Sequence, residues 1–213
     1  MMEGNKKGPL NPWIYIWTKP RATIQQIVDT NPQKFVVRLT CIEGFAGYLE
    51  HARFLRSLGD KYDWPIIFVK AAIVGPIAGL IALYFVAAMI SWTGKWIGGK
   101  APSRSIRAAI AWSAVPTIWA LILWIPQLIL FGQELFTTHI PRIHSSPSLW
   151  FMFLGFGVIN ITISIWAFVI YLRCLGQVQG FSIWKVLCNT TLASLVSIVP
   201  IAIIAIIIIS LYR

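Results

Sequence analysis

Four apolar stretches of this chain are each long enough to cross a membrane as a helix. They cover residues 65–92, 108–131, 149–172 and 187–211. A hydrocarbon core about 30 Å thick needs about 20 predominantly apolar residues in helical form. In lipid the backbone must satisfy its own hydrogen bonds, and a helix does so within one segment. The sequence therefore predicts an all-α fold of the polytopic membrane class.

The composition points to the same class. Of the 213 residues, 57% are hydrophobic and only 12% are charged, whereas a soluble domain carries about 25% charged residues. The net charge of +11 would suggest nucleic acid as the partner of a soluble protein. In a membrane protein, basic loops instead face anionic lipid headgroups. We therefore expect membrane lipids, and no nucleic acid, as partners.

Residues 35–56 are a weaker candidate for a fifth span, because Arg38, Glu43 and Glu50 interrupt the apolar run. Charged residues inside a span are tolerated where they face the protein interior. If this segment did not cross, the basic N-terminal cluster would lie on the side opposite the basic 93–107 loop. That arrangement contradicts the usual concentration of Lys and Arg on the cytoplasmic side. The sequence therefore predicts five transmembrane helices.

With five crossings and the N-terminus inside, the basic residues favour the cytoplasmic side twelve to six. The cytoplasmic set is Lys6, Lys7, Lys19, Arg21, Lys34, Arg38, Lys95, Lys100, Arg104, Arg107, Arg173 and Lys185. The outer set is Arg53, Arg56, Lys61, Lys70, Arg142 and Arg213. This asymmetry predicts a multi-pass protein of the cell membrane with a cytoplasmic N-terminus and the C-terminus outside.

Three ionisable residues inside the predicted spans are candidates for a polar site: Glu43, Glu50 and Lys70. At 1.5 Å of rise per residue, Glu50 and Lys70 lie at comparable depth, so we expect an ion pair between them. Such a pair would dock two helices, or it would mark a polar route for an ion, a proton or a lipid headgroup. Glu43 has no partner at its own depth, and it is either protonated or paired with Arg38.

The span over residues 65–92 contains Gly75, Pro76 and Gly79. Small residues four apart let helix backbones approach closely, and a proline bends a helix. Close helix packing and a hinge that gates a site are both consistent with this pattern. Pro116 and Pro200 lie inside later spans, so we expect kinks there as well.

No motif predicts an enzyme, a cofactor or a metal site. The stretch GKWIGGK, residues 94–100, resembles a phosphate-binding loop, but Ala101 stands where a Ser or Thr would hold Mg²⁺. His139, His144 and Glu134 share one predicted outer loop. Their spacing across Pro141 fixes no metal geometry, and we expect a solvated loop.

The segment before the first span reads NPWIYIWTKPRATIQQIVDTNP, residues 11–32. Pro20 suits the first turn of a helix, and Asn31-Pro32 would end it. Trp13, Trp17, Lys19 and Arg21 are suited to anchoring at the depth of the headgroups. We expect an amphipathic helix on the cytoplasmic leaflet; the alternative is a lid across the inner loops. The predicted division is a cytoplasmic segment, residues 1–33, and a membrane domain, residues 34–213.

This stretch, followed by GPIAGLIALYFVAAMISWTGKWIGGKAPSRSIRAAIAWSAVP and LGQVQGFSIWKVL, resembles the bacterial branch of the Ypt-interacting-protein (YIP) family. The likeness covers about residues 11–211. It implies five membrane helices, a cytoplasmic N-terminus and a non-enzymatic role. Eukaryotic relatives are associated with membrane trafficking, binding of small GTPases and association with each other. Their long N-terminal region with an Asp-Leu-Tyr-Gly-Pro-like motif is missing here, which argues against recruitment of a GTPase.

Two functions of different class follow as hypotheses. One is a membrane-organising, trafficking-like or adaptor protein that binds lipids, other membrane proteins or a second copy of itself. The other is a small transporter or lipid-translocating protein that uses Glu43, Glu50 and Lys70. A role as an assembly factor for a larger complex is a third possibility.

Overall fold

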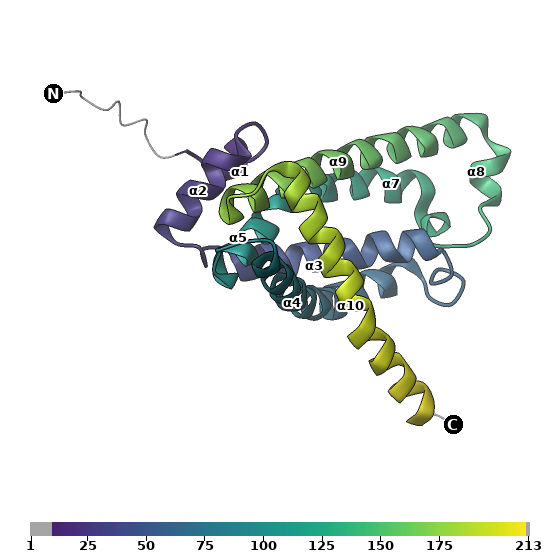
Figure 1. Cartoon of the computed structure of the whole chain (residues 1–213). Coiled ribbons are helices and arrows are strands. Elements are labelled where there is room, and N and C mark those ends of the chain that lie inside the picture. The colour runs from purple at the N-terminus through teal and green to yellow at the C-terminus, as the bar shows by residue number, and fades with distance from the viewer. Residues whose placement is uncertain (1–9, 212–213) are drawn as a thin grey trace. The chain divides into compact units, whose positions relative to one another are not determined.

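The computed structural model describes residues 10–211, and every regular element in that range is a helix. Four stretches are long and apolar enough to cross a membrane: Trp64–Trp96, Ser103–Leu135, Pro147–Gln179 and Ile183–Pro200. They contain the four predicted apolar stretches, apart from the end of the last one, so the prediction of a polytopic helical membrane protein is confirmed. Figure 1 shows the order of these helices along the chain. Lys6, Lys7 and Arg213 of the charge count lie outside the described residues.

The fifth predicted span is a helix, α3 (Val36–Leu55), of 20 residues. Twenty residues rise about 30 Å, which matches a hydrocarbon core. Nevertheless α3 is not among the four stretches that are apolar enough to cross, because Arg38, Glu43 and Glu50 lower its hydropathy. Five crossings therefore stay a prediction.

The second apolar stretch is not one continuous helix. It consists of α5 (Ser103–Ser113), α6 (Val115–Ala120), η1 (Leu121–Leu123) and α7 (Trp124–Phe131). The break at Ala114 comes just before Pro116, which lies in the first turn of α6. Proline has no N–H to continue the preceding helix, but it fits the first turn of a new one. Pro76 and Pro200 lie inside unbroken helices, α4 (Trp64–Trp96) and α10 (Ile183–Leu211).

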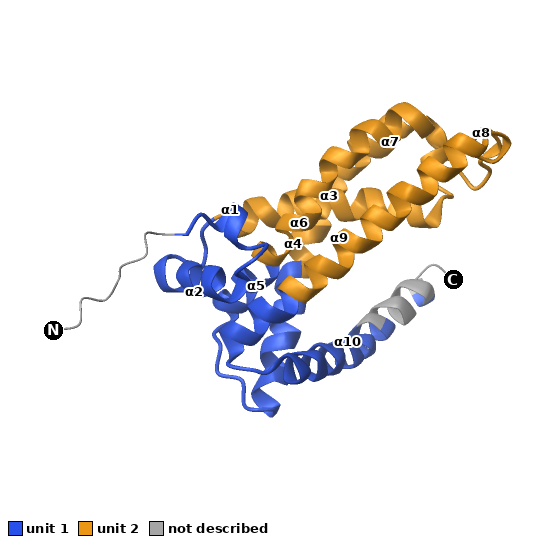
Figure 2. Ribbon diagram, turned by 90° about the horizontal axis from the view of Figure 1, so that it is seen from above, with its two compact units in different colours: residues 1–34, 83–110, 171–213 blue, residues 35–82, 111–170 orange. Residues whose placement is uncertain are grey.

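The chain packs into two compact units, which Figure 2 shows in different colours. Unit 1 comprises residues 1–34, 83–110 and 171–213, and unit 2 comprises residues 35–82 and 111–170. Each unit has its own apolar core: Ile90, Leu175 and Val186 belong to that of unit 1. Helix α4 and helix α9 (Pro147–Gln179) each contribute residues to both units.

In unit 2, helices α3 and α4 touch backbone to backbone at three glycines. A Cβ added to Gly79 would lie 2.9 Å from Gly44 Cα, and one added to Gly75 would lie 2.7 Å from Gly44 O. Any side chain at these positions would therefore force the helices apart. Gly75 and Gly79 of α4 thus pack directly against Gly44 of α3.

Two loops of unit 2 are bonded to each other. The side-chain amide of Gln133, in η2 (Gly132–Leu135), donates to the carbonyls of Gly59 and Tyr62 at 2.7 and 2.9 Å. Its side-chain carbonyl accepts from the backbone N–H of Trp64 at 2.6 Å. The Gly59 N–H in turn donates to Phe136 O at 2.9 Å. The α3–α4 loop and the loop after α7 therefore lie side by side, as expected if both connect helices on one side of a membrane.

We expect this loop contact to weaken in acid. The Thr138 hydroxyl and backbone N–H donate to the Asp60 carboxylate at 2.5 and 3.2 Å. These bonds hold the pKa of Asp60 below its ordinary value of 3.8. Because the folded-state pKa is lowered, the contact contributes stability above the ordinary value, and that stability is lost as the pH falls through the lowered value.

A carboxyl-carbon NMR titration checks this prediction. In the Thr138→Val variant, which keeps the backbone donor, the pKa of Asp60 should move part of the way back toward 3.8. An Asp60 titration that is the same in both proteins would contradict the assignment.

Unit 1 contains the N-terminal helices α1 (Pro12–Tyr15) and α2 (Pro20–Thr30), α2 with Pro20 in its first turn and Asn31 directly after it, as predicted. The buried face of α2 consists of Pro20, Thr23, Ile24 and Ile27. This face packs against the end of α9: the Cys174 thiol donates to Pro20 O at 3.8 Å, and the Gln177 amide donates to Gln25 Oε1 at 3.1 Å. The helix α2 is therefore held by protein contacts along one side.

Candidate functional site: a polar cavity among membrane helices

Unit 2 encloses a cavity of about 430 Å³ that is lined by three parts of the chain. The polar residues of the lining come from α3, from α6 and from α9. The full lining is Glu43, Ala46, Gly47, Glu50, Arg53, Thr117, Ala120, Leu121, Trp124, Asn160, Ile161, Ile163, Ser164 and Ile165.

The charged side of the cavity follows from helical periodicity. Residues three, four or seven positions apart share one face of a helix, so Glu43, Glu50 and Arg53 form a stripe along α3. Of the two predicted partners Glu50 and Lys70, only Glu50 belongs to this lining. Gly47 lies in the same stripe, and nothing lies within 4 Å of a Cβ built there. On α3, the open space of the cavity therefore lies over Gly47, between the side chains of Glu43 and Glu50.

Glu43 is bonded to the helix on the opposite side of the cavity. The Thr117 hydroxyl lies 2.6 Å from Glu43 Oε2 and 2.7 Å from Ala114 O. A hydroxyl has one hydrogen to donate, and one hydrogen can be shared between two acceptors. The Thr117 hydroxyl therefore shares its hydrogen between the Glu43 carboxyl oxygen and the Ala114 carbonyl. Thr117 lies just after the break between α5 and α6, and Ala114 O also accepts from the Ile118 backbone N–H at 3.0 Å.

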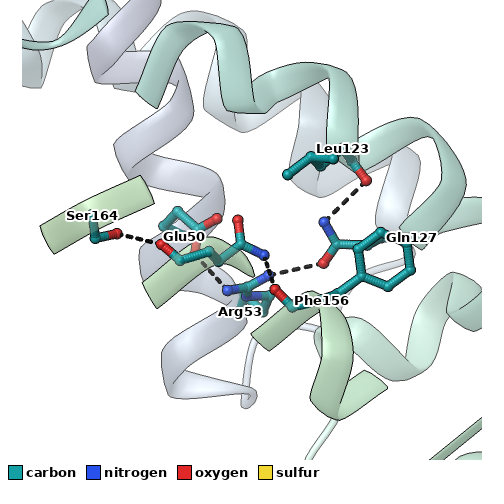
Figure 3. A network of polar contacts seen from close by, with 7 residues as sticks. Glu50, Arg53, Leu123, Gln127, Phe156 and Ser164 are labelled. Carbon is teal, nitrogen blue, oxygen red and sulfur yellow. Dashed lines mark hydrogen bonds and ion pairs between the residues drawn. The ribbon is translucent and has the colours of Figure 1, made fainter. Parts of the chain in front are cut away.

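Glu50 and Arg53 form an ion pair of 3.0 Å, in which the Arg53 side chain is 20% exposed and that of Glu50 45%. Arg53 Nη1 also donates to Gln127 Oε1 at 2.9 Å, and Gln127 Nε2 donates to Leu123 O at 3.0 Å. Figure 3 shows the Arg53 side chain between Glu50 and Gln127. The guanidinium lies 5.7 Å from the ring centre of Trp124. Arg53 is thus fixed from α3 and α7 together.

The α9 side of the cavity carries neutral polar groups. Asn160 Nδ2 donates to Phe156 O and Ser164 Oγ donates to Asn160 O, both at 2.9 Å within the helix. Both side chains still have oxygen lone pairs for a ligand. Ile161 and Ile165 line the same wall and are each 61% exposed. The cavity is therefore bounded on α9 by apolar side chains that reach the outer face of unit 2.

The predicted ion pair between Glu50 and Lys70 is wrong. Glu50 is paired with Arg53, and the Lys70 ammonium lies 3.1 Å from the centre of the Tyr62 ring. Arg38 does not meet Glu43 either, because its guanidinium lies over the Phe35 ring at 5.6 Å. The structure therefore brings Glu43 and Glu50 to one cavity and leaves Lys70 outside its lining.

Sequence reasoning missed five polar residues of this network: Arg53, Thr117, Gln127, Asn160 and Ser164. Two signals were available. Arg53 stands three positions after Glu50, the spacing of a local ion pair, and Gln127 and Asn160 are amides inside otherwise apolar spans, where polar side chains bond between helices or mark a function.

The other predicted residues are not among the residues that line this cavity. Gly75, Pro76 and Gly79 belong to the α3–α4 crossing region, Pro116 follows the α5–α6 break, and Pro200 lies in α10. Trp13, Trp17, Lys19 and Arg21 belong to the N-terminal segment of unit 1. The functional roles predicted for them are not tested by their positions.

The loop with His139, His144 and Glu134, which the sequence predicts to be on the outer side, is organised by other contacts. The Glu134 carboxylate accepts from the backbone N–H groups of Arg142 and Ile143 at 3.0 Å each, at the start of α8 (Pro141–Ser145). His144 stacks on Trp150 with ring centres 4.9 Å apart. Within residues 10–211, no three His, Cys, Asp or Glu side chains gather as they would around a metal ion.

Comparison with known proteins identifies a family. The family model described as Yip1 domain matches residues 14–211, which include every helix from α2 to α10. No curated protein and no solved structure matches the chain significantly.

Proposed function

This chain belongs to the Yip1-domain family and is an integral, multi-pass membrane protein, and we propose that it organises membranes by binding lipids and other membrane proteins without catalysing a reaction. Its setting is the cell membrane, with the N-terminus in the cytoplasm and the C-terminus outside. The observation that supports lipid binding most directly is the polar cavity of unit 2.

The size and position of the cavity suit a lipid headgroup. Its 430 Å³ falls in the range of about 300–1,000 Å³ that is usual for small-molecule sites. The polar groups on α3 and α6 provide hydrogen bonds, while Ile161 and Ile165 lead from the cavity to the apolar outer face. A lipid can place its headgroup among the polar residues and its acyl chains along these isoleucines.

The charges suit a zwitterionic headgroup. Arg53 uses Nη1 for Gln127 and Nη2 for Glu50, and a guanidinium has five N–H donors in all, so donors are left for a phosphate. Glu50 is 45% exposed and would accept from an ammonium group. The cavity thus offers both signs of charge on one helix, three residues apart.

The proposed topology has five crossings. The α3–α4 loop and the loop after α7 are bonded to each other within unit 2. Within unit 1, Thr93 of α4 donates to Asn189 of α10 at 2.7 Å. Each set contains segments that the charge count assigns to one side, and this holds with four crossings as with five. Support for α3 as a crossing helix comes from its bonds along the second apolar stretch, between Glu43 and Thr117 and between Arg53 and Gln127. The division into a segment of residues 1–33 and a membrane domain of residues 34–213 is part of this proposal.

In this topology α2 lies at the cytoplasmic surface. Its buried face contacts α9, while Arg21 and Lys19 are exposed and are suited to meet anionic headgroups. The contact with α9 supports the lid, and the exposed Lys19 and Arg21 support the interfacial helix.

Filling the cavity tests the proposal. Gly47→Leu places an apolar side chain in the lining, and nothing lies within 4 Å of a Cβ built at this position. We expect cross-linking of a headgroup-photoactivatable phosphatidylethanolamine to the α3 and α9 peptides to fall to background in bilayer nanodiscs. The matched control is Gly155→Leu on α9, which also meets open space but lies outside the cavity. Undiminished labelling of the same peptides in the Gly47 variant would sink the proposal.

A second candidate function is translocation of lipid or protons, which the Glu43–Thr117 contact at the α5–α6 break favours. Proteoliposome assays for lipid scrambling and proton flux separate it from a purely organising role. The organising role predicts rates equal to those of protein-free liposomes. Activity in the wild type that Glu43→Gln abolishes would establish the second function in its place.

A further inference from the structure

Unit 1 contains a cavity of its own, of about 440 Å³, at the start of α2. Its charged lining consists of Lys19 and Arg21 from the N-terminal segment and Arg173 from α9. Thr18, Pro20, Ala22 and Ile183 complete it. The structure therefore joins three cations from two distant parts of the chain around one hollow.

No acidic residue in the described part of unit 1 is paired with these cations. Within the described part of unit 1 the single acidic residue is Asp29, and every other charged side chain is Lys or Arg. Asp29 stands eight positions after Arg21, so it lies about 12 Å further along α2, where it accepts from Gln25 at 2.8 Å. Among residues 10–211 none of the three cations forms an ion pair. Lys19 lies 5.6 Å from the centre of the Tyr15 ring, which leaves its charge uncompensated.

The backbone adds to the positive potential. The first turn of α2 has no side-chain cap at Lys19, and the N–H groups at the start of a helix have no partner within it. Arg21 and Ala22 supply two such groups, and both residues line the cavity. The partial positive charge at the start of α2 therefore adds to the charge of the three side chains that line this cavity.

We propose that this cavity binds a phosphoryl group, supplied either by an anionic phospholipid headgroup or by a free phosphate ester. Two arginines favour phosphate in particular, because a guanidinium matches two phosphate oxygens at once. The site goes beyond a general attraction of α2 to anionic lipid, because Arg173 belongs to α9 and fixes a position for the anion. It shares no residue with the cavity of unit 2, so the two proposals can fail separately.

The lipid arm of the test uses the full chain in phosphatidylcholine bilayers that contain spin-labelled phosphatidic acid. The measured quantity is the motionally restricted fraction of this probe relative to spin-labelled phosphatidylcholine. We expect the wild type to prefer phosphatidic acid and the Arg21→Gln/Arg173→Gln variant to lose that preference. The matched control is Lys100→Gln/Arg104→Gln, which removes the same charge from exposed positions of unit 1 outside the cavity.

The second arm identifies the source of the phosphoryl group. The detergent-solubilised wild type and the same two variants are titrated calorimetrically with inorganic phosphate and with glycerol 3-phosphate. Heat that is lost only in the Arg21/Arg173 variant supports a site for free phosphate esters. Lipid preference without such heat supports a headgroup site.

Two results overturn the proposal. One is an equal loss of lipid preference in the control variant, which would mean attraction to diffuse surface charge. The other is a wild type with neither lipid preference nor phosphate heat. Arg21→Lys/Arg173→Lys keeps the charge and the exposed side chains, and a partial preference in it shows that the glutamine variant fails through charge and not through misfolding.

Discussion

The Gly44→Leu variant is expected to lose about 3 kcal/mol of stability or more, because its side chain has no place between α3 and α4. A Cβ on Gly44 would already overlap Gly75 O and would lie 3.1 Å from Gly79 Cα. These neighbours are backbone atoms and cannot rotate away, so the helices must separate. The loss is measured by unfolding the purified protein in mixed micelles with increasing denaturing detergent, followed by circular dichroism.

Gly47→Leu is the matched control for this variant. It makes the same substitution on the same helix, less than one turn away, but nothing lies within 4 Å of the added Cβ. Leucine favours a helix over glycine by about 0.8 kcal/mol, so this variant should be at least as stable as the wild type. Equal destabilisation by the two substitutions would show that the close approach of α3 and α4 is not what the glycine at position 44 provides.

Trp124→Ala is expected to cost about 3–5 kcal/mol, the usual loss for a large buried aromatic residue. Trp124 is 5% exposed and stacks on Phe136 with ring centres 5.7 Å apart. Its edge contact with Phe68 is 6.1 Å between ring centres. Because Trp124 also lines the polar cavity and lies under Arg53, the variant should lose headgroup cross-linking together with stability.

Trp119→Ala is the control for this prediction. Trp119 lies one and a half turns earlier in the same stretch and is 55% exposed. Its removal should change stability by about 0.5 kcal/mol, as at other exposed positions. If the two tryptophan variants unfold at the same detergent fraction, the packing assigned to Trp124 is wrong.

The four long apolar stretches were predictable because the hydropathy and the length of a stretch can be read directly from its residues. The same reasoning foresaw a disturbance at Pro116, since a proline cannot continue the helix before it. It did not foresee that the stretch divides into α5, α6, η1 and α7. Thr117 next to the break donates its hydroxyl to Ala114 O and to Glu43, and hydropathy does not reveal such side-chain contacts.

The candidate site was predictable in part. Glu43 and Glu50 were recognised as polar residues in a span. Because they are seven positions apart, they lie on one face of the helix. The partner of Glu50 was predicted wrongly because depth along a helix says nothing of rotation about its axis. Lys70 has a suitable depth but lies over Tyr62, whereas Arg53, on the same helix as Glu50, is within reach whatever the neighbouring helices do.

Unit 1 is formed by segments that are far apart in the sequence, and this affects its biosynthesis. The contact between Pro20 and Cys174 joins residues 154 positions apart. At about 5–20 residues per second, the ribosome needs roughly 8 to 30 s to make the chain between them. During that interval helix α2 has been synthesised, but the part of α9 against which it packs has not. Helix α2 is thus made well before its packing partner on α9, and it is open to chaperones or insertion factors until that partner is made.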